Sequence, residues 1–151
     1  MPKLSDEAES FYISVYEMVQ RVPVGHVTTY GHIARMIGAP QNSRQVGSAL
    51  KYLRAGNHNE GEDGAATTLV EFNSESVPWW RVISSDGRIA FRARESMDRQ
   101  GQRLQAEGIE VRGDSNNRPR IISLSDYGWF PRADDDDDDE IYESIPSANV
   151  L

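Results

Sequence analysis

Two adjacent tryptophans and an arginine occupy the central segment Pro78-Trp79-Trp80-Arg81-Val82-Ile83 and limit the chemistry available there. An indole offers a flat apolar surface, but it cannot act as a nucleophile as a cysteine thiolate does. The chain of 151 residues contains no cysteine, which excludes disulfides, cysteine-based zinc sites and a cysteine nucleophile. His26, His32 and His58 are scattered without metal-ligand spacing, so no metal site is expected. The segment therefore favours binding over covalent chemistry.

The net charge of -8 is unevenly distributed along the chain. Residues 133–151 contain eight acidic residues and residues 55–76 contain five, with no lysine or arginine in either segment. The remainder has 11 acidic and 16 basic residues, a charge of about +5, which is compatible with phosphate binding. No apolar run approaches the roughly 18 residues of a membrane span, and the N-terminus lacks a secretory signal. We expect one domain that neither spans a membrane nor is secreted.

Three helices are predicted in the first third of the chain. The first begins after Ser5 and has an apolar stripe at 3.6-residue spacing, formed by Phe11, Val15, Met18, Val19 and Val22. Thr28 or Thr29 caps the second helix, and Ser43 caps the third. The apolar faces are Ile33, Ala34 and Ile37 in the second, and Val46, Ala49, Leu50 and Leu53 in the third. Because a turn at residues 38–42 joins these two helices, they predict a helix-turn-helix.

The later part of the chain predicts a small β wing and a closing helix. Val82-Ile83 and residues 88–91 flank Ser84-Ser85-Asp86-Gly87, whose Asp-Gly step favours a hairpin. A helix is expected from about Glu95 to Glu107, with Gly108 as its stop in the left-handed conformation. Residues 109–111 and 121–124 favour short strands or extended segments.

These elements predict a mainly α (α+β) domain, a winged helix-turn-helix, over residues 1–132. Residues 55–76 form an acidic loop insertion. Near its end, the apolar residues Leu69, Val70 and Phe72 are expected to pack against the rest of the domain. Residues 133–151 form an acidic disordered tail, because the run from Asp134 to Asp139 repels itself. The tail is interpreted either as a solubility extension or as carrying a segment, Asp134 to Glu140, that competes with nucleic acid for the basic part of the domain or docks onto a basic partner.

Five stretches, taken in order, resemble the DNA-binding domain of the O6-alkylguanine-DNA alkyltransferases. They are Val22–Gly31, Ser43–Leu50, the central segment, Ser85–Ile89 and Gln102–Gly108, with a weaker similarity at Tyr127–Pro131. The resemblance covers about Phe11 to Val111, although residues 55–76 replace the family's short connection before the central segment. In the family that segment reads Pro-Cys-His-Arg-Val, and its cysteine takes the alkyl group from guanine. Since Trp79 replaces the cysteine, the chain resembles the alkyltransferase-like proteins, which recognise the lesion without repairing it.

The resemblance implies a lesion pocket that receives a damaged nucleotide rotated out of the duplex. Its residues would be Tyr30, Pro78, Trp79, Val82 and Arg92. Tyr30 matches the tyrosine beside the flipped nucleotide, and Arg92 matches the arginine that faces the base. A lone tryptophan is more often a core residue, and that interpretation is preferred for Trp80 but not for Trp79.

The third helix would enter the minor groove of DNA. The DNA-binding residues implied by the resemblance are Thr29, Tyr30, Arg44, Gln45, Gly47, Ser48 and Lys51. Arg44 would fill the gap left by the rotated nucleotide, and the small Gly47 and Ser48 would let the backbone approach closely. The alternative is an ordinary solvated face on an amphipathic helix.

Trp80 departs from the family, whose members keep a histidine at this position. In the catalytic enzymes that histidine relays a proton to a glutamate, and the resemblance assigns the position of this glutamate to Glu107. With Trp80 in place no base remains to activate a nucleophile, so we expect no enzymatic activity and no cofactor. The larger indole also implies a rearranged interior around Glu107.

The sequence therefore predicts a non-enzymatic protein that recognises O6-alkylguanine in double-stranded DNA. The family role implies signalling to nucleotide excision repair proteins by a monomer, in the nucleus of a eukaryote or in the cytoplasm or nucleoid of a bacterium. The alternatives are a winged-helix regulator without lesion specificity and a protein-interaction module that has lost DNA binding. A catalytic alkyltransferase is excluded by the missing cysteine.

Overall fold

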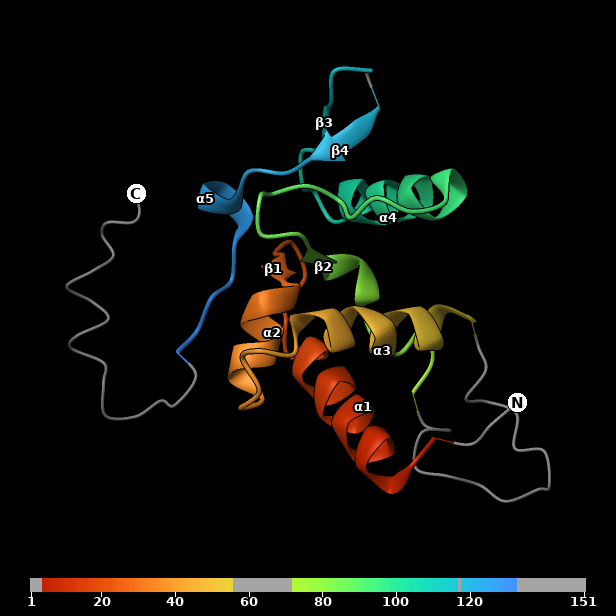
Figure 1. The fold of residues 1–151 in the computed structure, drawn as a ribbon. Helices are drawn as coiled ribbons and strands as arrows, with labels where there is room; N and C mark the ends of the chain where they lie inside the picture. Colours follow the sequence, from red (N-terminus) through yellow and green to blue (C-terminus); the bar gives the residue numbers. More distant parts are fainter. Residues whose placement is uncertain (1–3, 56–71, 117, 133–151) are drawn as a thin grey trace.

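The computed structural model describes residues 4–55, 72–116 and 118–132, a helical body with two small strand pairs (Figure 1). In chain order its helices are α1 (Asp6–Val19), α2 (Tyr30–Met36), α3 (Ser43–Ala55), the 3₁₀ helix η3 (Trp79–Arg81), α4 (Arg94–Ala106) and α5 (Leu124–Tyr127). Its strands are β1 (Thr28–Thr29), β2 (Val82–Ile83), β3 (Arg112–Gly113) and β4 (Pro119–Ile121). The mainly α (α+β) class that the sequence predicts is confirmed.

Helix α1 packs across α3 and supplies one side of the core (Figure 1). It begins as predicted, because the amide of Ala8 donates to Ser5 Oγ at 3.1 Å and caps the first turn. Within the predicted apolar stripe Phe11 is only partly covered, whereas Val15, Met18, Val19 and Val22 are buried. Tyr16 is completely buried, and its hydroxyl donates to the Ala49 carbonyl of α3 at 2.7 Å. This bond fixes α1 against α3.

Helices α2 and α3 form the predicted helix-turn-helix. Thr29, one of the two predicted caps, is the N-cap of α2. Gly38 ends that helix with φ of +83°, a conformation that favours glycine. Helix α3 begins at Ser43 itself, so the prediction that Ser43 caps it is wrong by one residue. The carbonyl of Asn42 accepts from the Val46 amide at 3.1 Å and starts the helix. The predicted core face is confirmed, because Val46, Ala49, Leu50 and Leu53 are buried.

Strand β2 pairs with β1 in parallel, which corrects the prediction that Val82-Ile83 forms a hairpin with residues 88–91. Thr28 is paired with Val82, and Thr29 with Ile83. The predicted turn exists, with the Ser84 amide donating to the Arg88 carbonyl at 2.9 Å. Both residues of β2 are fully buried, however, and are held by the start of α2 instead of by the outgoing arm. The Asp-Gly turn therefore forms as predicted, but β2 takes its strand partner from an earlier part of the chain.

The outgoing arm of that turn joins β4 instead. Arg88 forms an antiparallel bridge with Ile121, and the Ile89 amide donates to the Arg120 carbonyl at 2.9 Å. The hairpin that corresponds to a wing is β3–β4, which lies beyond α4 at the top of Figure 1. Helix α4 itself agrees with its predicted bounds to within one residue at each end, and Gly108 follows it with φ of +88°.

Phe72, which follows the acidic insertion, and the C-terminal part of the described chain both pack onto the body of the domain. Phe72 is 8% exposed and lies 5.4 Å from Tyr16 between ring centroids, so its predicted pinning role is confirmed. Leu69, Val70 and the acidic tail 133–151 lie outside the described residues. The Val27 amide donates to the Tyr127 carbonyl at 2.9 Å, which fastens the C-terminal segment beside β1. No helix among the described residues is long and apolar enough to cross a membrane.

Replacing Tyr16 with phenylalanine is expected to destabilise the domain by about 1 kcal/mol. The change removes the buried hydroxyl that bonds the Ala49 carbonyl but keeps the aromatic ring. Urea unfolding followed by circular dichroism measures the loss. Tyr12→Phe is the matched control, because the Tyr12 ring is partly buried and its hydroxyl bonds no other described residue. Equal stability of the two variants would show that the bond between α1 and α3 contributes nothing.

Candidate functional site

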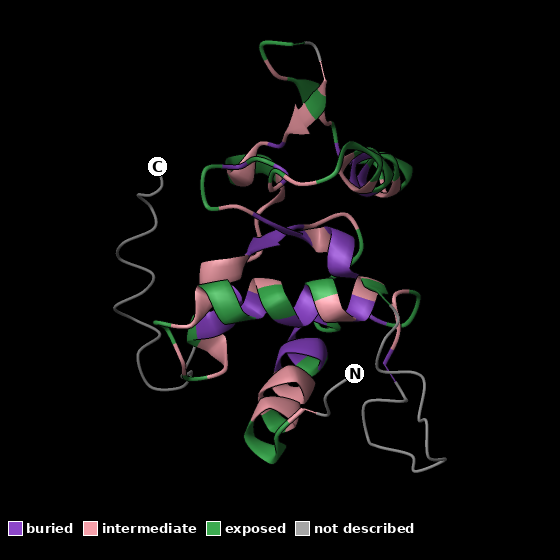
Figure 2. Ribbon diagram, turned by 45° about the vertical axis from the view of Figure 1, so that its right-hand side comes forward, coloured by how far each residue is buried: buried purple, intermediate pink, exposed green. Residues whose placement is uncertain are grey.

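The solvent face of α3 is basic and has little side-chain bulk. Arg44, Gln45, Ser48 and Lys51 are exposed along it, opposite the buried stripe, and Gly47 is half-buried (Figure 2). Neither Arg44 nor Lys51 forms a salt bridge with a described residue. Their charges are therefore available to an anionic partner such as a nucleic-acid backbone.

Tyr30 lies at the edge of this face, because it is the first residue of α2. A methyl group added at Gly47 would lie 3.9 Å from Tyr30 Cε1, so the ring rests beside the middle of α3. Thr29, which sets the start of α2, is 7% exposed, and its hydroxyl accepts from the His32 amide at 3.1 Å. The structure thus gives Thr29 a capping role, whereas Tyr30 and the exposed residues of α3 form one continuous surface.

The central segment contains the short 3₁₀ helix η3, and its two tryptophan rings meet edge to face. Their centroids lie 5.8 Å apart, and their planes meet at 86°. Trp79 is 3% exposed and Val82 is fully buried, with Pro78 also buried beside them. The indole nitrogen of Trp79 has no hydrogen-bond partner among the described residues, and the guanidinium of Arg54 lies 5.4 Å from the ring centroid. Trp79 is thus covered by a cation and retains an unused donor.

Arg92 is held in place by three hydrogen bonds from its guanidinium. They run to Ser96 Oγ at 2.9 Å, to the Ala90 carbonyl at 3.2 Å and to the side-chain oxygen of Gln100. Burial lowers the pKa of Arg92, while the neighbouring Tyr30, within hydrogen-bonding reach of the guanidinium, favours its charged form. The structure therefore brings Arg92 together with Tyr30, two residues that are far apart in the sequence.

Gln100 connects Arg92 to the central segment. Its side chain is 1% exposed, and its amide nitrogen donates to the Trp80 and Val82 carbonyls at 3.0 Å each. Sequence reasoning did not single out Gln100, Ser96 or Arg54. Gln100 could have been found as a polar residue on the apolar stripe of the predicted closing helix, four residues before Leu104.

Glu107 binds two residues of the central segment, Trp80 and Arg81. Its carboxylate accepts from Trp80 Nε1 at 2.8 Å, from Arg81 Nη2 at 2.7 Å and from the Gly25 amide at 2.9 Å. Burial opposes its ionisation, but the bonds from Arg81, Gly25 and Trp80 outweigh it and lower the Glu107 pKa. Trp80 is 8% exposed, as the core interpretation predicts. At the position of the family histidine, the Trp80 indole thus donates a hydrogen bond to Glu107.

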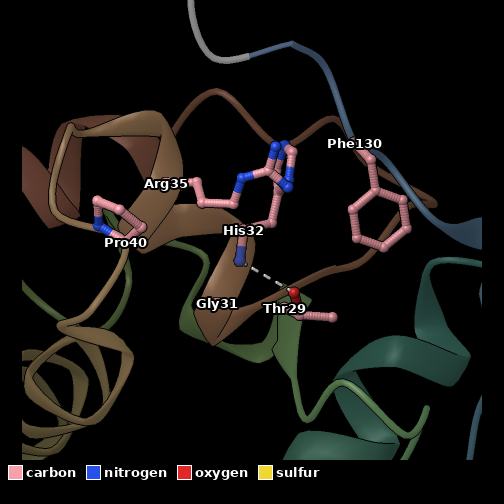
Figure 3. Close-up of a pocket in the computed structure, with 6 residues that line it drawn as sticks. All are labelled: Thr29, Gly31, His32, Arg35, Pro40 and Phe130. Carbon is pink, nitrogen blue, oxygen red and sulfur yellow. Dashed lines mark hydrogen bonds between the residues drawn. The ribbon is translucent and has the colours of Figure 1, made fainter. Parts of the chain in front are cut away.

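A separate cavity of about 370 Å³ lies on the side of α2 that faces the C-terminal segment (Figure 3). The residues that line it are Thr29, Gly31, His32, Arg35, Pro40 and Phe130. The rings of His32 and Phe130 meet edge to face, with centroids 5.2 Å apart. None of the lining residues belongs to the group around Trp79 and Arg92, so this cavity is distinct from the predicted lesion pocket.

Comparison with known proteins shows the family and the fold of this chain. A model of the 6-O-methylguanine DNA methyltransferase DNA-binding domain matches residues 10–109. The chain belongs to this family. Relatives in the family include the DNA base-flipping protein of Vibrio parahaemolyticus, 37% identical over 123 residues, which are 82% of this chain and 99% of the relative. Alkyltransferase-like protein 1 of Schizosaccharomyces pombe is 37% identical over 124 residues, 82% of this chain and 97% of the relative.

A solved structure with the same fold is that of S. pombe Atl1 in complex with damaged DNA containing O6-carboxymethylguanine. It matches with a TM-score of 0.63 and 38% identity over 82% of this chain and 97% of that chain. The fold and the family that the sequence predicts are therefore confirmed.

Replacing Glu107 with glutamine is expected to destabilise the domain by roughly 3 kcal/mol at neutral pH, because it leaves the nearly buried Arg81 without an anion. The pKa of Glu107 is lowered in the folded state from its ordinary value of 4.5. Its carboxylate therefore stabilises the fold above about pH 4.5, and this stabilisation is lost as the pH falls toward the folded pKa. The stability gap between wild type and Glu107→Gln should shrink in that range.

Chemical denaturation at a series of pH values measures this gap. Glu110→Gln is the control, since Glu110 is exposed and forms no salt bridge with a described residue. A gap that is the same at pH 3 and pH 7 would contradict the role assigned to the ionised carboxylate.

Proposed function

We propose that this protein is a non-enzymatic sensor of O6-alkylguanine in double-stranded DNA. The observation that carries the proposal is the convergence of Tyr30, Trp79 and Arg92 beside the exposed basic face of α3. An aromatic ring, an indole wall and a cation are the groups that bind an unstacked base. The names of the relatives, which mention base flipping and damaged DNA, support the same interpretation.

The binding step follows from the position of α3. Arg44 and Lys51 neutralise phosphates as the helix enters the minor groove, and the small Gly47 and Ser48 allow close approach. Arg44 occupies the space left in the stack when the damaged nucleotide rotates outward. Extrusion costs a few kcal/mol, which stacking on aromatic rings and the contact with Arg92 offset.

The pocket residues then have separate tasks. Tyr30 contacts the base and its phosphate, and Trp79 forms the wall against which the O6-alkyl group rests. The buried indole N–H of Trp79, which has no hydrogen-bond partner among the described residues, would gain one from an acceptor on the edge of a base bound against the ring. Pro78 and Val82 back this wall from the core. Arg92 faces the base from the opposite side, positioned by Gln100.

No alkyl group is transferred in this scheme. The chain has no cysteine, and at the position of the family histidine Trp80 donates its N–H to Glu107 instead of accepting a proton. The complex of monomeric protein and distorted DNA serves as the signal to nucleotide excision repair proteins. In a eukaryote this activity belongs to the nucleus.

Wild-type protein is expected to bind a duplex with one O6-methylguanine at least about tenfold more tightly than the matched guanine duplex. Arg44→Ala should lose most of this preference, because the extruded state is no longer held open. Fluorescence anisotropy at a stated salt concentration measures both affinities. Arg21→Ala, which removes an exposed positive charge from outside α3, is the control. Equal affinity for the two duplexes would contradict the sensor hypothesis and favour the alternative, a DNA-binding regulator without lesion specificity. Intact lesion binding by Arg44→Ala would contradict the flipping step.

Gln100→Met is expected to reduce the lesion preference by about tenfold, because Arg92 loses an acceptor that orients it. The variant should also be less stable, since the Trp80 and Val82 carbonyls lose their bonds to the side chain. Affinities are therefore compared at a temperature where both proteins are folded. Gln105→Met, at an exposed position of the same helix, is the control. Unchanged discrimination by folded Gln100→Met would remove Gln100 from the recognition site.

A further inference from the structure

Arg54 lies directly over the wall of the proposed pocket. It occupies the last turn of α3, and its guanidinium is 5.4 Å from the centre of the Trp79 ring. The side chain is half-buried and makes no hydrogen bond or salt bridge with any described residue. An arginine that is partly removed from water loses hydration, and no described residue of this protein replaces it with an anionic partner. A ligand anion at this place would supply the missing partner.

Two further arginines lie near Arg54. Burial and the nearby charge of Arg92 lower the pKa of Arg54 to about 10, and Arg99 acts in the same direction. Arg99 also lowers the pKa of Arg92. Within the described part of the chain no carboxylate forms a salt bridge with any of the three. The positive charges of Arg92 and Arg99 thus add to that of Arg54, which lies over Trp79, and they favour an anion near this ring.

The position of this cluster relative to the base determines what it can select. Arg92 faces the ring system of the base, whereas Trp79 marks where the O6 substituent ends. Since the Arg54 guanidinium lies over Trp79, it would lie next to a substituent that rests against this ring in the proposed function. A neutral methyl group gains only a hydrophobic contact there, but a carboxylate gains a charge-assisted and bidentate hydrogen bond.

We propose that Arg54 makes this protein prefer O6-alkylguanine adducts whose substituent carries a negative charge, such as O6-carboxymethylguanine. This inference rests on the proposed function, because it names the lesion class of the same pocket. The competing source of negative charge is a DNA phosphate. A phosphate contact would strengthen binding to every duplex equally, whereas contact with the substituent acts on one adduct only.

The test compares four duplexes of one sequence, with guanine, O6-methylguanine, O6-carboxymethylguanine or O6-carbamoylmethylguanine at the same position. The carbamoylmethyl group has nearly the same shape as carboxymethyl and no charge. Wild type is expected to bind the carboxymethyl duplex about tenfold more tightly than the carbamoylmethyl duplex. Arg54→Gln should remove this ratio and retain the preference for O6-methylguanine over guanine. Arg54→Lys keeps the charge without the planar guanidinium and should retain part of the ratio.

Lys51→Gln is the matched control, because it removes a positive charge one turn earlier on α3 and should weaken all four duplexes while keeping the ratio. Thermal unfolding confirms that each variant is folded. A wild-type ratio near one overturns the inference, and so does an equal loss for all four duplexes in Arg54→Gln, which assigns Arg54 to a phosphate. If Arg54→Gln does not fold, the wild-type ratio and Arg54→Lys still decide. Loss of discrimination between O6-methylguanine and guanine in wild type would instead defeat the proposed function.

Discussion

The carboxylate of Glu107 is the interaction on which the site depends. It lies after the last turn of α4 and accepts hydrogen bonds from the turn before β1, from Arg81 and from the Trp80 indole. Arg81 in turn donates to the Val22 carbonyl at 2.7 Å and ties the end of α1 into the same cluster. These groups are largely buried, so an unpaired carboxylate or guanidinium here would be costly. The hydrogen bonds between them therefore stabilise the conformation of the central segment. The bonds to Trp80 and Arg81 thus fix the two residues that directly follow Trp79 in the central segment.

Trp80 shows how the loss of a catalytic pair can be compatible with a stable interior. A histidine at this position would exchange a proton with the glutamate, whereas the indole N–H only donates. The larger ring is accommodated because its faces are covered by arginines, with the Arg103 guanidinium 4.4 Å from the Trp80 ring centroid. The Trp80 indole therefore holds Glu107 by a fixed hydrogen bond and cannot relay a proton to it. A rigid wall suits a pocket that has to hold a base without reacting with it.

The distribution of charge separates two tasks on neighbouring surfaces. Arg44 and Lys51 on α3 are exposed and suited to the exchange of counterions along a duplex, which gives affinity without selectivity. Arg92 and Arg54 are partly buried next to aromatic rings, where an unpaired cation is more costly and a matching ligand gains more. The parallel pairing of β1 with β2 brings these two groups together, since it places the start of α2 beside the central segment. The exposed basic face of α3 and the proposed base pocket thus meet at Tyr30.

Although it did not predict η3 or α5, the sequence by itself determined the helices α1 to α4, the helix-turn-helix and the choice of most candidate site residues. Their apolar spacing, the Ser5 and Thr29 caps and the Gly108 stop are local properties, and the missing cysteine excludes transfer chemistry without any structure. Tertiary structure alone decided that β2 pairs with β1, that the hairpin is β3–β4 and that Gln100 orients Arg92. It also placed Arg54 over Trp79, two residues that are far apart in the chain. Such contacts join residues far apart in the chain, and their energies depend on burial and on partners that no local pattern of residues encodes.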